Sequence, residues 1–181
     1  LFKGIDVRNY GSGNAGTTNT LRTLGKPAGY IVFLGDALKA VFAVWIVRYL
    51  LFPGLGDVTK ILETVTALGV VIGHNYPFYM HFKGGKGIAA TFGCFLGLLP
   101  HWIPLCVLAS IFIFFSCVVK INPNYYRTVA TYILAAICTV WLEPNRYIVF
   151  GFLLIAASVL AKLFMSAEEK EHFEVKLAWK H

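Results

Sequence analysis

Long apolar runs alternate with short polar loops along this chain. The run over 28–52 is long enough for a helix that crosses a bilayer, and Pro53 and Gly54 end it. A second run covers 58–79 and contains Pro77 near its end. The pattern predicts six membrane-spanning helices in all, and the remaining four are expected at 88–99, 102–119, 128–142 and 147–164.

The apolar stretch over 88–119 is divided into two of these helices on the basis of charge. It contains 32 residues, which is more than one ordinary span needs, and prolines interrupt it. Basic pairs flank it, Lys83 with Lys86 and Lys120 with Arg127. Because positive charge collects in cytoplasmic loops, both pairs should face the same compartment, and that requires an even number of crossings between them.

Composition supports an integral membrane protein of one domain. The chain has 181 residues, of which 57% are apolar and 14% are charged, whereas soluble domains are about a quarter charged. The predicted fold class is all-α, a polytopic bundle of transmembrane helices over 1–181, with a charged tail over 162–181 that is a further helix candidate. The four cysteines lie in apolar runs without C-x-x-C spacing, so we interpret them as small buried hydrophobic residues and expect no metal site.

The formal net charge of +7 is distributed unevenly. All of the excess positive charge lies in three loops that fall on one side of the predicted bundle. Nucleic-acid binding is the other common explanation of a basic chain, and it is disfavoured because no helix presents a basic face. The charge therefore predicts cytoplasmic loops rather than a nucleic-acid partner.

The first polar loop, near 3–27, has the composition of a phosphate site. Its glycines let backbone N–H groups converge on one anion, and its hydroxyl and amide side chains add donors. Arg22 supplies a guanidinium that binds phosphate with two hydrogen bonds, and it would share a face with Asn19 on a helix that begins near Thr18. A flexible turn is an equally good interpretation of this loop taken alone. The candidate binding residues are Gly11, Ser12, Gly13, Asn14, Thr18, Asn19 and Arg22.

The second polar loop, over 73–87, favours the phosphate interpretation. Its last residues lead directly into the apolar run at Ile88, so their N–H groups can lie at a helix N-terminus. This is not a Walker A loop, since Met80 and Gly87 stand where that pattern needs a glycine and a hydroxyl. His74 is either a general base or phosphate contact, or an interfacial histidine bonded to a carbonyl. The candidate residues are His74, Gly84, Gly85, Lys86 and Gly87.

Asp36 and Lys39 stand three positions apart within the first apolar run. Charges inside a membrane helix are costly and are usually paired or functional. An ion pair that stabilises the helix and a functional role both fit this spacing.

The two polar loops resemble those of a known family. Residues 6–19, DVRNYGSGNAGTTN, together with 21–26, are similar to the first motif of bacterial acyl-phosphate:glycerol-3-phosphate acyltransferases, the PlsY family. Residues 73–77 and 82–87 resemble the second motif, and 36–39 resembles the helix that follows the first. The resemblance extends over roughly the first half of the chain.

The resemblance implies an enzyme of phospholipid synthesis. Such an enzyme transfers a fatty acyl group from acyl phosphate to the sn-1 hydroxyl of glycerol 3-phosphate, giving lysophosphatidic acid and phosphate. It would need no cofactor and act as a monomer among membrane lipid in the bacterial inner membrane, with its active-site loops on the cytoplasmic side. Ser12, Arg22, His74 and Lys86 would be catalytic. The family has seven membrane helices, of which the first precedes the first motif, so this chain is expected to lack that helix.

The third motif of the family differs in this chain. That motif contains a histidine, an asparagine and a glutamate, whereas 161–170 contains neither of the first two. Glu168, Glu171 and His172 are candidates to replace them. A paralogue that binds acyl phosphate or phospholipid without turnover, or that uses another acceptor, is therefore an alternative. A small transporter is a third, although the polar loops gather on one face and not near the bilayer midplane.

Overall fold

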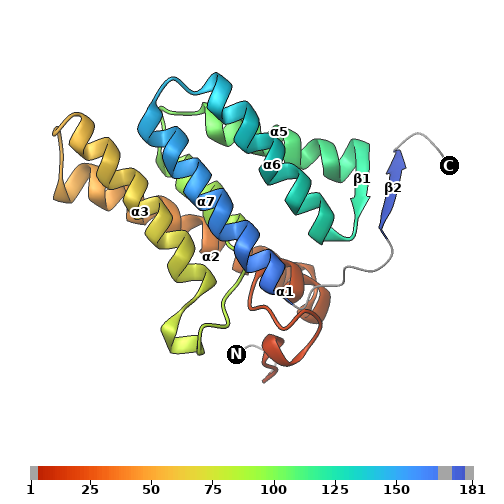
Figure 1. Cartoon of the computed structure of the whole chain (residues 1–181). Helices are drawn as coiled ribbons and strands as arrows, with labels where there is room; N and C mark the ends of the chain where they lie inside the picture. The colour runs from red at the N-terminus through yellow and green to blue at the C-terminus, as the bar shows by residue number, and fades with distance from the viewer. Residues whose placement is uncertain (1–3, 167–172, 178–181) are drawn as a thin grey trace.

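The computed structural model describes residues 4–166 and 173–177, and this part of the chain is mostly helical. Figure 1 shows a bundle of long helices with one short helix near the N-terminus. Two π-helical turns, Ile46–Leu51 and Phe114–Val118, continue the second and fifth helices. The helices are α1 Thr17–Leu24, α2 Lys26–Trp45, α3 Asp57–Asn75, α4 Ile88–Gly97, α5 Ile103–Ile113, α6 Asn124–Leu142 and α7 Arg146–Met165.

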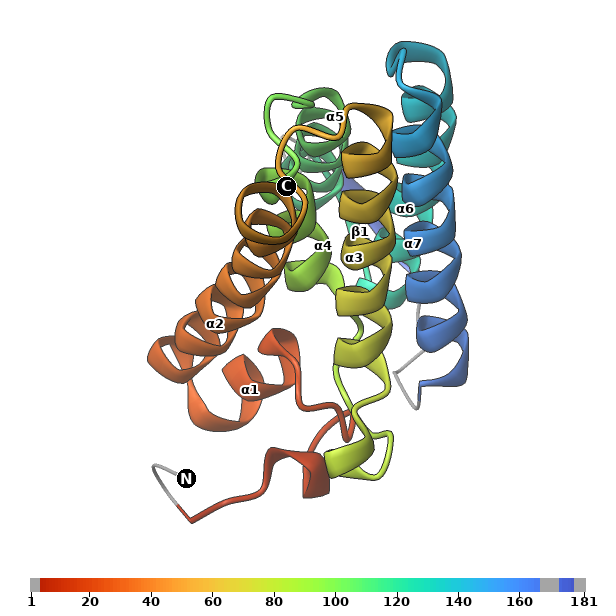
Figure 2. The same cartoon turned by 90° about the vertical axis from the view of Figure 1, so that its left-hand side faces the viewer.

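The long helices pack side by side, and the pairs α2 with α4 and α3 with α7 run parallel to each other. Helix α2 packs on α4, α3 on α7, and α5 on α6, which also contacts α7. Figure 2 shows that α1 lies across the lower end of the bundle, beneath α2 and α4. The connection between α3 and α4 descends to the same end (Figure 2). The two polar loops of the sequence are thereby brought to one end of the molecule.

Glycines set the close contact between α2 and α4. A Cβ on Gly93 would overlap the backbone carbonyl of Ala37, and a Cβ on Gly97 would lie 3.0 Å from Cβ of Val44. Gly93 and Gly97 are four positions apart on one face of α4, the spacing that lets two membrane helices approach backbone to backbone. This contact fixes where the N-terminus of α4 stands relative to α2.

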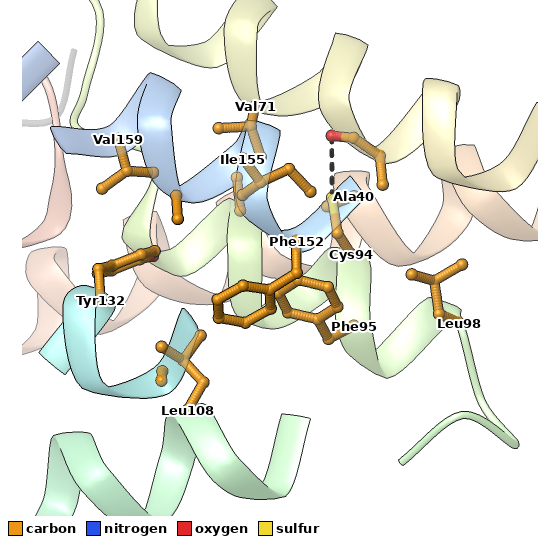
Figure 3. Packing of buried hydrophobic residues seen from close by; sticks show 14 of the residues in the cluster. Ala40, Val71, Cys94, Phe95, Leu98, Leu108, Tyr132, Phe152, Ile155 and Val159 are labelled. Atoms are coloured by element: carbon orange, nitrogen blue, oxygen red, sulfur yellow. Dashed lines mark hydrogen bonds between the residues drawn. The ribbon is translucent and has the colours of Figure 1, made fainter. Parts of the chain in front are cut away.

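The centre of the bundle is filled by aromatic and aliphatic side chains from α3, α4, α6 and α7. Phe95 and Phe152 stack with ring centroids 5.1 Å apart, and Tyr132 lies fully buried beside them. Figure 3 shows this packing and the hydrogen bond that Cys94 Sγ donates to the carbonyl of Ala67, at 3.4 Å.

The outer surface of the bundle is strongly apolar. Large side chains such as Leu50, Trp141 and Phe150 are more than 60% exposed, as suits a surface covered by lipid. Two helical segments, Lys26–Leu51 and Arg146–Met165, are both long and apolar enough to cross a bilayer, and two shorter apolar helices accompany them. All six predicted runs are helical, but the number that span the membrane stays a prediction.

The mostly helical fold is as predicted, and the described residues add to it a small antiparallel ribbon. Strand β1, Val119–Asn122, pairs with β2, Glu174–Leu177, so that Val119 lies opposite Leu177. The predicted helix at the tail is thus wrong over 173–177, because the alternating Glu-Val-Lys-Leu sequence finds a strand partner there. The prediction of four buried cysteines is also wrong, because Cys106 and Cys117 are exposed on the outer surface of the bundle.

Candidate active site

The side chain of Asn19 organises the first polar loop. Its Nδ2 donates to the carbonyls of Val7, Tyr10 and Asn14 at 2.8–3.0 Å, and its Oδ1 accepts from the Ser12 N–H at 3.1 Å. Asn19 is only 2% exposed, so these bonds are shielded from water. Gly11 passes so close that a Cβ there would overlap Asn19 Oδ1, and its φ of +58° is a conformation that glycine adopts without strain. The hydrogen bonds of Asn19 therefore fix the backbone conformation of the first loop.

The first polar loop rests directly on the second. A Cβ on Gly16 would lie 3.5 Å from Cα of Gly85 and 4.0 Å from the backbone nitrogen of Lys86. Gly84 and Gly85 in turn lie against His74, and a Cβ on either of them would overlap atoms of that residue. The two loops and the end of α3 thus form one continuous structure.

Two helices point their N-termini into the same space. Helix α1 begins at Thr17 after Gly16, and α4 begins at Ile88 after Gly87; neither N-cap residue supplies a side-chain hydrogen bond. The first N–H groups of a helix lack intrahelical partners and carry partial positive charge. Both helix N-termini contribute to one cavity, and Lys86, two residues before α4, lines it too. This arrangement is suited to bind an anion.

A cavity of about 210 Å³ lies where these elements meet. Its polar lining comes from both loops and the two helix N-termini. Its aromatic lining is Phe33 from α2 together with Phe92 and Phe112, which are in edge-to-face contact with centroids 5.9 Å apart. The cavity is lined by Ser12, Asn14, Gly16, Thr17, Thr18, Asn19, Phe33, Asp36, His74, Lys86, Gly87, Ile88, Ala89, Phe92 and Phe112.

Asp36, Lys39 and His74 form a three-membered polar cluster at this cavity. Lys39 Nζ lies 2.6 Å from Asp36 Oδ1 and 2.9 Å from His74 Nδ1, while His74 Nδ1 lies 3.3 Å from Asp36 Oδ1. The ion pair expected within the first apolar run is therefore present, and it also reaches a residue of the second loop. Asp36 and His74 both line the cavity.

Comparison with known proteins identifies the family of this chain. The sequence matches the family described as glycerol-3-phosphate acyltransferase over residues 1–170. The chain belongs to that family. It is 36% identical to a glycerol-3-phosphate acyltransferase of Geotalea daltonii over 159 residues, which are 88% of this chain and 77% of that protein. It is 38% identical to that of Staphylococcus haemolyticus over 164 residues, again covering 88% and 77% of the two chains.

Solved structures agree with this assignment. The glycerol 3-phosphate form of PlsY (YgiH), an integral membrane glycerol 3-phosphate acyltransferase, has a TM-score of 0.69 and is 30% identical, covering 89% of this chain and 76% of that one. The lysophosphatidic acid form of PlsY has a TM-score of 0.65 at 28% identity, over 83% and 72%. The resemblance inferred from the two polar loops is confirmed, and the acyltransferase is a membrane protein.

Most of the sequence-predicted residues of the acyltransferase come together, but not all. Ser12, Asn14, Thr18, Asn19, His74, Lys86 and Gly87 line the cavity, while Gly11, Gly13, Gly84 and Gly85 support the loops behind it. Arg22 and Asn19 both lie on α1, which begins near Thr18 as expected, but Arg22 is exposed and is not part of the cavity lining, whereas Asn19 is buried. The roles of these residues remain predictions.

Sequence reasoning missed the three phenylalanines that line the cavity of the acyltransferase, because they were indistinguishable from other apolar residues of the helices. Thr17, one of the hydroxyl donors expected in the first loop, lines the cavity too, and its Oγ1 is buried with no hydrogen-bond partner among the described residues.

Lys162 fastens the second loop of the acyltransferase to α7. Its Nζ donates to the carbonyl of Phe82 at 3.2 Å and lies 4.4 Å above the ring of Tyr76. Lys162 belongs to the segment, 161–170, that departs from the third motif of the family. Glu168, Glu171 and His172, the expected replacements for that motif, lie outside the described residues.

An ion pair caps the start of the first loop. Arg8 bonds Asp6 through side chain and backbone, with Nη2 to Oδ2 at 2.7 Å, and these bonds hold the pKa of Asp6 at about 2, below its ordinary 3.8. Because the folded pKa is the lower one, the contribution of the pair is complete above pH 3.8 and is lost as pH falls through about 2. The pair is thus unchanged at neutral pH.

Proposed function

We propose that this chain transfers a fatty acyl group from acyl phosphate to the sn-1 hydroxyl of glycerol 3-phosphate, producing lysophosphatidic acid and phosphate. The observation that carries the proposal is the mixed lining of the cavity. Lys86 and two helix N-termini supply polar groups, and Phe33, Phe92 and Phe112 supply aromatic rings. A molecule with a phosphate head and a hydrocarbon tail matches both kinds of group.

The phosphate of acyl phosphate is placed against the N-termini of α1 and α4. The hydroxyl of Thr17, the N–H groups of the two first turns and Lys86 would hold its oxygens. The hydrocarbon tail would pass the phenylalanines and leave between helices into lipid. Glycerol 3-phosphate would bind among the same polar groups, where Ser12 and Asn14 offer further donors.

The reaction needs positioning and charge stabilisation more than a protein nucleophile. The acceptor oxygen attacks the acyl carbonyl carbon, an ester bond forms, and the bond from that carbon to the phosphate oxygen breaks, so that phosphate leaves with the electron pair. Holding two reactants in contact supplies much of the rate, and fixed donors stabilise the departing phosphate. Two groups can take the hydroxyl proton: His74 and a phosphate oxygen of either substrate.

We place the enzyme in the inner membrane as a monomer, with the cavity on the cytoplasmic side. Support comes from three basic residues in the segments at the cavity end of the bundle, namely Arg22 on α1, Lys26 at the start of α2 and Lys83 on the second loop. At the opposite end, Arg48 is paired with Glu63 and Lys60 with Asp57.

Phosphate release from palmitoyl phosphate, with and without glycerol 3-phosphate, tests the proposal in purified protein in lipid nanodiscs. Lys86→Met should lower acceptor-dependent turnover by about 10²-fold or more, the usual loss when one fixed donor is removed from a charged transition state. Lys83→Met is the matched control, because Lys83 is exposed on the same loop and does not line the cavity. Equal turnover of wild type and Lys86→Met would refute the site.

A second candidate is an acyl-phosphate-binding protein with no turnover or with another acceptor. The observation that favours it lies at the end of α7, where 161–166 carries neither histidine nor asparagine. Binding of palmitoyl phosphate without release of phosphate would support a non-catalytic role. Turnover that appears with a different small alcohol and not with glycerol 3-phosphate would indicate an altered acceptor.

A further inference from the structure

We propose that Asp36 and Lys39 are positioning residues that hold the imidazole of His74 in the tautomer protonated on Nε2. This inference rests on the proposed function, because it assigns the part that His74 plays in acyl transfer. The first observation is the contact of Lys39 Nζ with both Asp36 Oδ1, at 2.6 Å, and His74 Nδ1, at 2.9 Å. The pair on α2 thus reaches across to α3 at the cavity.

The hydrogen-bonding capacity of Lys39 decides which nitrogen of the His74 ring carries the proton. A lysine ammonium has three donors and no acceptor, so Lys39 can bond His74 Nδ1 only if that nitrogen presents its lone pair. The neutral ring then carries its hydrogen on Nε2. In the opposite tautomer, an Nδ1–H would face the ammonium donor to donor, and its distance of 3.3 Å to Asp36 Oδ1 exceeds the usual range for an N–H···O bond.

Asp36 has a part of its own in this arrangement. It lies on the same turn of α2 as Lys39, three positions before it, and its carboxylate accepts a hydrogen bond from the ammonium group of Lys39. This bond directs a flexible four-carbon side chain, which is 45% exposed, toward the ring. The His74 side chain is only 9% exposed, so water competes poorly with Lys39 for Nδ1.

Nε2 faces the second loop. A Cβ on Gly85 would overlap Nε2, so the N–H edge of the ring lies directly against the glycine turn beside Lys86. The charged groups around the ring are Asp36 and Lys39 on α2 and Lys86 on the loop; α1 contributes the hydroxyls of Thr17 and Thr18 to the same cavity.

The chemical consequence is that His74 donates and does not act as a base. Nδ1 is occupied by Lys39 and Nε2 already carries a proton, so the ring has no free lone pair for the hydroxyl proton of the acceptor. The Nε2–H is instead a donor to a phosphate oxygen held beside Lys86. The hydroxyl proton then moves to a phosphate oxygen of a substrate as the new ester bond forms.

The tautomer is measured directly by ¹⁵N NMR of histidine-labelled protein in nanodiscs at pH 8, with His74→Gln used to assign the signals. Wild type should show protonated Nε2 and unprotonated Nδ1. Lys39→Met should move the proton to Nδ1, where the Nδ1–H can donate a hydrogen bond to Asp36. Lys39→Arg keeps a cationic donor at this position and should keep the original tautomer. Lys60→Met is the control, since Lys60 has the same three-residue spacing to Asp57 at the other end of the bundle.

Kinetics separate positioning from simple stabilisation of α2. Lys39→Met should lower kcat by about tenfold or more with an unchanged unfolding temperature. In the His74→Gln background, the same substitution should add nothing, because its target is absent.

An Nδ1-protonated wild type, an unmoved tautomer in Lys39→Met, or additive losses in the double variant would each overturn the assignment. If the wild type turns over no acyl phosphate, the proposed function fails while the NMR result still decides the role of Asp36 and Lys39.

Discussion

Gly16 and Gly85 touch: a Cβ on the first would stand 3.5 Å from Cα of the second. These residues are far apart in the sequence, and their contact joins the two polar loops into one candidate anion site. The contact also makes the geometry testable, because a small side chain fits between the loops and a large one does not.

Gly16→Leu should lower turnover by about 10²-fold, whereas Gly16→Ala should retain it. The alanine Cβ makes an ordinary van der Waals contact, but a leucine has to displace Gly85 and the adjoining Lys86. A misplacement of about 1 Å costs roughly 10²-fold in rate. Phosphate release from palmitoyl phosphate is the measurement, and a Gly16→Leu enzyme as active as Gly16→Ala would show that the contact is irrelevant.

Arg22 can act only if its side chain swings from the surface of α1 to the bound anion. We expect Arg22→Ala to lower acceptor-dependent phosphate release by about 10²-fold, the scale of a lost charged donor. Lys26→Ala serves as the control, because Lys26 is a nearby exposed cation that does not line the cavity. Losses of similar size in both variants would mean that Arg22 contributes only general positive charge.

Gly93→Ala should destabilise the bundle, because the new methyl group would overlap the carbonyl of Ala37 and push α4 away from α2. Overpacking of this kind costs about 1–3 kcal/mol. Gly35→Ala on α2 is the matched control, since a Cβ there meets no atom within 4 Å. Thermal unfolding in nanodiscs should show a lower midpoint for the first variant alone, and equal midpoints would disprove the tight helix contact.

Glu63→Gln should lower stability without changing the chemistry. Arg48 Nε and Nη2 bond the two carboxylate oxygens of Glu63 at 2.7 Å, and the side chains are only 13% and 4% exposed. Arg48 is half-buried and keeps its bond to the carbonyl of Leu99, so the loss should be smaller than about 3–5 kcal/mol, the cost of a fully buried unpaired charge. Asp57→Asn breaks a pair whose carboxylate is 67% exposed, and it should cost less than about 1 kcal/mol. Unfolding midpoints measure both, and kcat below the midpoint should match wild type, because the pair lies at the other end of α3 from His74.

The positions of the helices followed from hydropathy. Helix α4 begins at Ile88 and α7 ends at Met165, within one residue of the expected bounds. Apolar side chains that must avoid water act on the chain locally, so their runs are visible in one dimension. Strand β1 was missed because its partner β2 lies more than fifty residues away, and a ribbon is stable only through that pairing.

The sequence by itself determined the class of protein, its family and the two polar loops, since each depends on composition or on contiguous residues. The tertiary structure decided which loop residues share a cavity. The spacing of residues does not determine which face of α1 packs against the rest of the protein. Only the packing of α1 showed that Asn19 is buried while Arg22 is exposed. The approach of Lys39 to His74, at 2.9 Å across two helices, likewise depends on how α2 and α3 are set against each other, and no local pattern encodes that arrangement.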